Sequence, residues 1–276
     1  MTTQSTIAFI GGGNMTRSLV GGLLADGYPA ERITVTEPEP DRRQALADDL
    51  GVTVTGDNVD TAANAGTVVL AVKPQVIHEV AEQIGGSIAD SGALVISIAA
   101  GVRIGDIERW LGGSPAVVRT MPNTPALVQS GATALVANAR VTEGQRNEAE
   151  SLLRAVGLTQ WLEDERLMDA VTAVSGSGPA YFFLLMEALE EAAVAQGLER
   201  EAARLLTLET AIGAAKMALE SSEPPARLRE RVTSPGGTTE QALRVLEEGN
   251  MRELMGRAVT AAARRAQELG TMLGER

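Results

Sequence analysis

The stretch from residue 232 to residue 243, V-T-S-P-G-G-T-T-E-Q-A-L, combines residue types that can bind a small anion. Its Pro-Gly-Gly turn leads to Thr238, which is expected to cap a helix and to form a T-x-x-Q capping box with Gln241. Such a turn directs free backbone N–H groups and two threonine hydroxyls into one small space, where the helix dipole favours a carboxylate. Taken alone, the same residues also suit an ordinary capped helix start.

A second anion-binding pattern lies near the N-terminus. The apolar residues 6–10 end in Gly11, Gly12 and Gly13, and a helical pattern follows over residues 14–24. A strand, a glycine turn and a helix in this order are the context of a dinucleotide-binding fingerprint, although Thr16 occupies its third small position. Gly11 permits the tight turn, and Gly13 lets a pyrophosphate approach the helix N-terminus.

Glu37 follows the next apolar run, residues 33–36, at the sequence distance expected for the acid that binds an adenosine ribose. An acid at this position favours NAD and repels a 2′-phosphate. Arg42 and Arg43 follow closely, however, and either can serve that phosphate instead. The cofactor preference therefore stays open, with the electrostatics favouring NAD.

Three distinctive loops follow further predicted strands: V-K-P-Q at 72–75, A-A-G at 99–101 and M-P-N-T-P at 121–125. Because ligands bind beyond the carboxyl ends of parallel strands, all three loops are expected to face one crevice. Lys73 is the only cation in its loop and can hydrogen-bond a cofactor hydroxyl or amide. The alternative is plain strand-to-helix punctuation, in which Pro and Gly are common.

The elements that must position these residues alternate between strand and helix. Strands are predicted at 6–10, 33–36, 67–71, 94–98, 117–120, 132–136 and 159–162, and helices at 14–24, 41–50, 74–84, 104–111 and 142–156. This alternation predicts an α/β fold, a Rossmann-type doubly wound parallel sheet covered on both faces. Domains are predicted at residues 1–163 and 164–276.

The second domain is predicted to be all helical, with helices at 167–174, 180–195, 200–218, 240–248 and 251–272. The helix that begins near Ala180 carries apolar side chains around much of its circumference, as does part of 205–219. Such helices must be buried by a neighbour, and about 110 residues cannot bury that surface alone. This domain is therefore expected to mediate obligate homo-oligomerisation.

Composition narrows the classes of partner. The formal net charge of -12 argues against nucleic acid and anionic membranes. The chain has no cysteine, which suits a reducing cytoplasm, and no signal peptide or membrane span is expected. With a single histidine, His78, a multi-histidine metal site is not possible, and no metal is expected.

Taken together, these features resemble the pyrroline-5-carboxylate reductase family, which reduces a cyclic imine to L-proline in the last step of proline biosynthesis. The resemblance rests on F-I-G-G-G-N-M at 9–15, L-A-V-K-P-Q at 70–75, M-P-N-T-P at 121–125, S-G-S-G-P-A-Y at 175–181 and the 232–243 stretch, which is the family signature. It extends over nearly the whole chain.

The resemblance implies a role for each site residue. NADPH or NADH would be held by Ile10, Gly11, Gly12, Gly13, Asn14, Met15, Glu37, Asn58, Ala71, Val72, Lys73, Pro74, Ala99, Ala100 and Asn123. The substrate would be held by Ser234, Gly236, Gly237, Thr238, Thr239 and Glu165. The family commonly uses NADPH, so the acid at Glu37 departs from its pattern. Family members form dimers that assemble into a decamer.

The expected chemistry is hydride transfer from the nicotinamide to the C=N carbon, which requires orientation rather than a metal or a strong nucleophile. Thr239 is the candidate that hydrogen-bonds the ring nitrogen. A β-hydroxyacid dehydrogenase is an alternative, but it needs a lysine on the helix after residues 175–178, where this chain has P-A-Y-F-F. A nonenzymatic dinucleotide sensor, the other alternative, has no use for a second anion site at residues 234–239.

Overall fold

The structure is a computed structural model that describes residues 5–275 and divides the chain into two compact units. The sheet unit holds the chain up to Ser177 and again from Ala262 onward, and the helical unit holds Gly178–Ala261. Within residues 5–275, no helix combines the length and apolar character needed to span a membrane.

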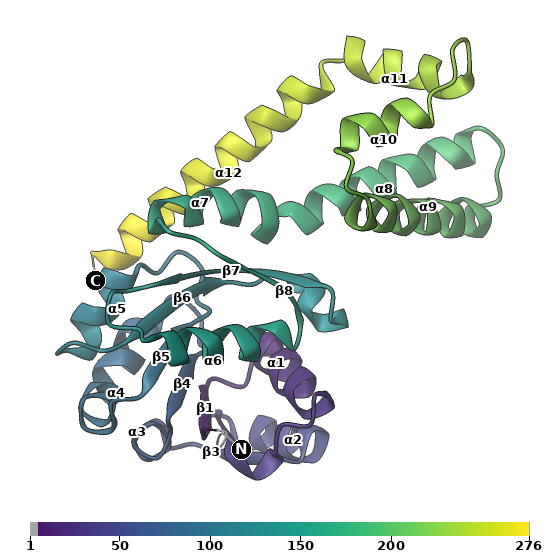
Figure 1. The fold of residues 1–276 in the computed structure, drawn as a ribbon. Helices are drawn as coiled ribbons and strands as arrows, with labels where there is room; N and C mark the ends of the chain where they lie inside the picture. Colours follow the sequence, from purple (N-terminus) through teal and green to yellow (C-terminus); the bar gives the residue numbers. More distant parts are fainter. Residues whose placement is uncertain (1–4, 276) are drawn as a thin grey trace. The chain divides into compact units, whose positions relative to one another are not determined.

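The sheet unit is built on eight strands in the order β3-β2-β1-β4-β5-β6-β7-β8 (Figure 1). The strands are β1 Ile7–Ile10, β2 Ile33–Thr36, β3 Thr53–Thr55, β4 Thr67–Leu70, β5 Leu94–Ser97, β6 Val117–Met121, β7 Gly131–Ala137 and β8 Gly157–Trp161. From β3 to β6 every pair is parallel. Ile10 lies beside both Thr36 and Leu70, so the carboxyl ends of these strands meet at one edge.

Helices cover both faces of the sheet because successive strand residues point to opposite sides. Phe9 belongs to a core packed against α1 (Asn14–Ala25) and α6 (Glu143–Arg154). Ile10 belongs to the opposite core, which is packed against α4 (Ile77–Ser91) and α5 (Ile104–Leu111). The predicted doubly wound α/β fold is thereby confirmed.

One strand pair departs from the predicted parallel sheet, since β7 runs antiparallel to β6. The connection between them holds only the short 3₁₀ helix η2 (Thr124–Val128). A parallel crossover needs a dozen or more residues, so the chain returns antiparallel. The sequence gives strand length and position here, but strand direction follows from the length of the connection.

Several elements begin elsewhere than predicted or were not predicted. The helix expected from residue 74 starts at Ile77, because residues 74–76 form a turn, and it continues through Gly85 and Gly86 to Ser91. The prediction missed β3, α3 (Asn58–Ala63) and α10 (Pro225–Arg231). These elements are short and lack an apolar period long enough to detect. The remaining helix of the sheet, α2, spans Pro40–Leu50.

After β8, every element of the described chain is helical. The 3₁₀ turn η3 (Glu165–Leu167), α7 (Met168–Val171) and a π-helical turn (Thr172–Gly176) still belong to the sheet unit, where Met168 is fully buried in the core. The compact units therefore divide at Ser177, whereas the predicted domain boundary at 163/164 follows the end of the last strand. The division of the chain into two domains at 163/164 therefore stays a prediction.

The helical unit has almost no core of its own. Its helices are α8 (Gly178–Ala195), α9 (Arg200–Glu220), α10, α11 (Thr238–Glu248) and the first part of α12 (Met251–Gly274). Only Gly178 and Ala203 are buried within Gly178–Ala261, while Phe182 and Phe183 are more than 60% exposed. Apolar surface on this scale marks an interaction site, as expected for a unit that is completed by another subunit.

Candidate active site

The glycine turn after β1 lies against the loop after β4. Gly11 has a φ of +109°, and a Cβ at this position would lie 2.8 Å from the carbonyl oxygen of Ala71. The Gly11 N–H donates to the Thr36 carbonyl at 3.0 Å, and the Ala71 N–H donates to the Ile10 carbonyl at 2.9 Å. Only glycine accommodates both the positive φ and the close approach.

The N-terminus of α1 is open to a ligand. Gly13 is its N-cap, no side chain caps the helix, and a Cβ on Gly13 would meet nothing within 4 Å. The first turn carries no acid, so the free N–H groups and the dipole suit a pyrophosphate. Thr16 is buried, and its hydroxyl donates to the Gly11 carbonyl at 2.6 Å. The threonine that made the fingerprint imperfect therefore braces the turn.

The cofactor residues predicted from the neighbouring loops lie at the same sheet edge. Ala71, Val72, Lys73 and Pro74 follow β4, and Ala99 and Ala100 follow β5. Lys73 is exposed, while Ala99 is buried and its N–H donates to the Ser97 hydroxyl at 3.3 Å. Asn58 begins α3, where its amide donates to Gln83 of α4 at 3.0 Å. The loops after β4, β5 and β6 leave the same edge because these strands are parallel, and their facing one crevice stays a prediction.

Asn123, predicted to contact the cofactor, has its amide committed within the protein. Its Nδ2 donates to the backbone carbonyl and to the hydroxyl of Ser175, both at 3.2 Å. Its Oδ1 accepts from the Ala132 N–H at 2.9 Å. Asn123 therefore ties the loop after β6 to the π-helical turn and to β7.

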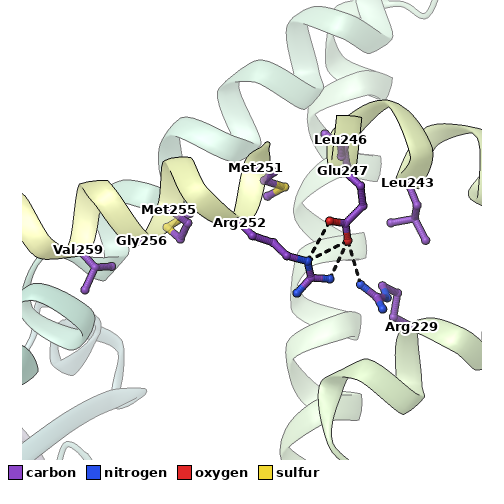
Figure 2. Close-up of a pocket in the computed structure, with 9 residues that line it drawn as sticks. All are labelled: Arg229, Leu243, Leu246, Glu247, Met251, Arg252, Met255, Gly256 and Val259. Carbon is purple, nitrogen blue, oxygen red and sulfur yellow. Dashed lines mark hydrogen bonds and ion pairs between the residues drawn. The ribbon is translucent and has the colours of Figure 1, made fainter. Parts of the chain in front are cut away.

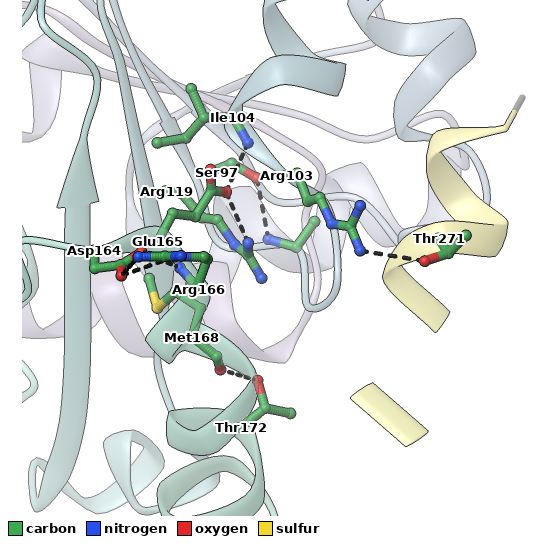
Figure 3. Close-up of polar contacts among 11 residues, drawn as sticks. Ser97, Arg103, Ile104, Arg119, Asp164, Glu165, Arg166, Met168, Thr172 and Thr271 are labelled. Carbon is green, nitrogen blue, oxygen red and sulfur yellow. Dashed lines mark hydrogen bonds and ion pairs between the residues drawn. The ribbon is translucent and has the colours of Figure 1, made fainter. Parts of the chain in front are cut away.

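Glu165, the predicted substrate-side acid, lies in the sheet unit and joins two elements there (Figure 3). Its Oε1 accepts from the guanidinium of Arg119 at 2.7 Å and from the Ile104 N–H at 2.9 Å. Arg119 is only 5% exposed, whereas the Glu165 side chain is 30% exposed. Glu165 therefore neutralises a buried cation of β6 and caps α5 from outside that helix.

The glycine-threonine loop lies in the helical unit, and its predicted capping box is wrong. The N-cap of α11 is Gly237, with no side-chain cap, so Thr238 and Thr239 are the first two helical residues. Instead of Gln241, Glu240 reaches back and its Oε2 accepts from the Gly236 N–H at 2.8 Å. With the extended Gly237 as N-cap, the helix starts one residue earlier than a cap at Thr238 predicts, and Glu240 takes the third helical position in place of Gln241.

This loop turns sharply and stays accessible. Gly236 has a φ of +73°, a conformation that favours glycine, and the Gly237 N–H donates to the Ser234 carbonyl at 3.0 Å. Ser234, Gly236 and Thr238 are exposed, and Thr239 is half-buried. The predicted substrate residues thus gather at one helix start, apart from Glu165, which belongs to the other unit.

A separate hollow in the helical unit contains none of these residues (Figure 2). It is lined by Arg229, Leu243, Leu246, Glu247, Met251, Arg252, Met255, Gly256 and Val259. Hydrogen bonds from Arg252 lower the pKa of Glu247, the one acid in the hollow. Its lining is part of the apolar surface of α11 and α12, which suits packing against protein rather than chemistry.

Comparisons with known proteins agree with this arrangement. Residues 165–269 match the family model for pyrroline-5-carboxylate reductase dimerisation, and residues 6–101 match a model for NADP oxidoreductase, coenzyme F420-dependent. The chain is 49% identical to pyrroline-5-carboxylate reductase of Pseudomonas aeruginosa, over 98% of both chains. The chain belongs to the pyrroline-5-carboxylate reductase family. The resemblance seen in the sequence motifs is thereby confirmed.

Solved structures of pyrroline-5-carboxylate reductases share the fold. The enzyme from Coxiella burnetii superposes with a TM-score of 0.93 at 52% identity, over 97% of this chain and 99% of the other. The Plasmodium falciparum enzyme, solved with NADP bound, gives a TM-score of 0.85 at 30% identity, over 96% and 98% of the two chains. The dimerisation model covers the helices that lack their own core, and the chain accordingly forms a homo-oligomer.

Sequence reasoning did not predict the supporting roles of three residues: Thr16, Arg119 and Ser175. Arg119 was detectable in principle, since a charged residue inside the apolar run V-V-R-T-M of a buried strand needs a partner. The identity of that partner was not detectable, because Glu165 lies 46 residues further along the chain.

Proposed function

We propose that this chain reduces the C=N bond of 1-pyrroline-5-carboxylate with NADH or NADPH and releases L-proline, as the last step of proline biosynthesis. The observation that carries the proposal is the occurrence of two helix starts without a side-chain cap in a member of this family. One is the open N-terminus of α1 behind Gly13, and the other is the start of α11. When bound, the reduced nicotinamide supplies the hydride.

For the cofactor, we assign the phosphates to residues 10–15 and the adenosine ribose to Glu37, with Asn58 on the adenine side. Residues 71–74, including Lys73, line the cofactor, and Ala99 and Ala100 lie beside the nicotinamide ribose. The shared sheet edge supports these assignments. Asn123 contributes by holding the loop after β6 in place, since its amide already has three partners.

For the substrate, we assign the carboxylate to the N–H groups at the start of α11. The first N–H groups of a helix have no acceptor within that helix, which leaves Thr238 and Thr239 as donors. The N–H groups of Gly236 and Gly237 are committed to Glu240 and Ser234, so these glycines shape the turn. The exposed hydroxyl of Ser234 completes the polar rim.

The half-buried hydroxyl of Thr239 is assigned to the ring nitrogen, which must carry a proton for the C=N bond to be electrophilic. No strong base is required, because the imine binds protonated or takes its proton through a hydroxyl and water. Holding the imine face in position can supply about 7–11 kcal/mol of the barrier. Glu165 can assist through Oε2, because both of its described hydrogen bonds use Oε1.

The direct test is oxidation of NADH and NADPH by the purified protein with pyrroline-5-carboxylate, scored by proline formation. Thr239→Ala should lower kcat/KM for the imine on the order of tenfold or more, with dinucleotide affinity unchanged. Thr239→Ser keeps the hydroxyl and is the matched control. Equal losses of imine turnover and dinucleotide affinity would contradict the role of Thr239, and absence of turnover in the folded oligomer would direct the search to larger cyclic imines.

The assembly is assigned as dimers arranged into a decamer that acts in the cytoplasm. The exposed apolar helices of residues 178–261 support assembly, since they lack a core within one chain. Light scattering on the purified protein measures the subunit number directly. A mass of two subunits would limit the assembly to the dimer.

A further inference from the structure

Glu37 places its carboxylate against the glycine turn. It follows β2, is only 6% exposed, and its Oε2 lies 3.1 Å from the position that a Cβ on Gly12 would occupy. Its Oε1 accepts from the Glu39 N–H at 3.3 Å. Within residues 5–275, this carboxylate makes no ion pair with any basic side chain. A carboxylate that is fixed beside the turn and not neutralised can accept hydrogen bonds from a diol and repels an anion.

Arg43, one of the two arginines that follow Glu37 closely in the sequence, hydrogen-bonds the backbone. The guanidinium Nη1 of Arg43 donates to the backbone carbonyls of Glu37 and Pro38, both at 2.8 Å. The same nitrogen lies 3.0 Å from the position of a Cβ on Gly56, so glycine there leaves room for it. Through Nη1, Arg43 therefore supports the backbone that carries Glu37, and moving that nitrogen to a 2′-phosphate would break both hydrogen bonds.

We infer that Glu37, with Arg43 committed to the backbone, makes this protein prefer NADH over NADPH. The inference rests on the proposed function only in assuming that the dinucleotide binds at the glycine turn. Discrimination comes from a repulsive element, since a 2′-phosphate would meet the fixed carboxylate of Glu37.

The test is direct binding of NADH and of NADPH by calorimetry, without the imine, to the purified oligomer. NADH should bind more tightly, on the order of tenfold or more. Glu37→Gln removes the charge but keeps the shape, so it should tighten NADPH binding several-fold and narrow the ratio of the two dissociation constants. Glu39→Gln is the matched control, because Glu39 is exposed and contributes only its backbone N–H to Glu37.

Three results would overturn the inference. The first is NADPH binding as tightly as NADH to the unmodified protein. The second is an unchanged ratio in Glu37→Gln, and the third is the same change in Glu39→Gln, which would assign the effect to net charge. A folded oligomer that binds neither dinucleotide would instead contradict the proposed function itself.

Discussion

Removing the Glu165 carboxylate should destabilise the sheet unit through Arg119. Glu165→Ala leaves a guanidinium that is 5% exposed without a counter-charge and leaves the Ile104 N–H without its acceptor. Breaking a fully buried ion pair costs about 3–5 kcal/mol. The 30% exposure of the Glu165 side chain lets water screen part of that loss. We therefore expect the free energy of unfolding to fall by about 2–3 kcal/mol.

The assay is urea unfolding at fixed protein concentration, followed by tryptophan fluorescence. Both tryptophans of the chain, Trp110 and Trp161, lie in the sheet unit, so the signal reports on that unit. Arg166→Gln is the control, because it breaks the neighbouring ion pair with Asp164, whose partners are exposed. That variant should unfold at the same urea concentration as the unmodified protein.

A double-mutant cycle with Arg119→Met separates the ion pair from other effects. In the Arg119→Met background, where the buried cation is absent, Glu165→Ala should lower the free energy of unfolding by about 1–2 kcal/mol less than it does in the unmodified protein. Strict additivity of the two substitutions, or a loss below about 0.5 kcal/mol in Glu165→Ala, would refute the reasoning. The loss of unfolding free energy that Glu165→Ala still causes in the Arg119→Met background measures the stabilisation that Glu165 gives by capping α5.

Further predictions concern binding, packing and ionisation. Gly13→Ala should change the free energy of unfolding by less than about 1 kcal/mol, since its Cβ meets only open space, yet weaken dinucleotide binding about tenfold or more in calorimetry. Asn123→Ala should lower the free energy of unfolding by about 1–3 kcal/mol in the same urea assay. Asn123→Asp should lower it by less, because the aspartate keeps the acceptor for the N–H of β7 and loses only the donors to Ser175. Burial raises the pKa of the Tyr28 hydroxyl above its ordinary value of 10.0. The stability that the neutral hydroxyl contributes is therefore fully present below pH 10.0 and is lost as the pH rises through the raised pKa. The tyrosinate absorbance that disappears in Tyr28→Phe should therefore titrate above pH 10.0, and titration at or below that value would contradict the burial argument.

The positions of the long elements followed from the sequence because their apolar patterns are strong. The strand at 33–36 and the helix at 104–111 were predicted with the bounds that the structure gives. The open α1 N-terminus also followed from the sequence, because strand, glycine turn and helix are contiguous. These features depend on neighbours within a few residues, which a local pattern records.

The errors have a common physical origin. The cap of α11 was assigned to Thr238 because T-x-x-Q fits the motif, yet the φ of +73° at Gly236 and the extended Gly237 favour Glu240 as the residue that reaches back. Strand β7 was placed in a parallel sheet because an apolar run marks a strand but not its direction, which here follows from the short connection before it. In both cases, the local motif was compatible with two backbone paths.

The sequence by itself determined the family, the doubly wound sheet, the glycine turns that precede two helices and the need for a partner to cover the helical unit. Each of these follows from motifs or from apolar residues that recur at a regular period. Only the tertiary structure decided that Arg119 is paired with Glu165, that Asn123 holds Ser175, and that Arg43 supports the backbone of Glu37. A buried charge or amide needs a partner, but any of several side chains can satisfy it, and folding selects the one that packing brings within hydrogen-bonding distance.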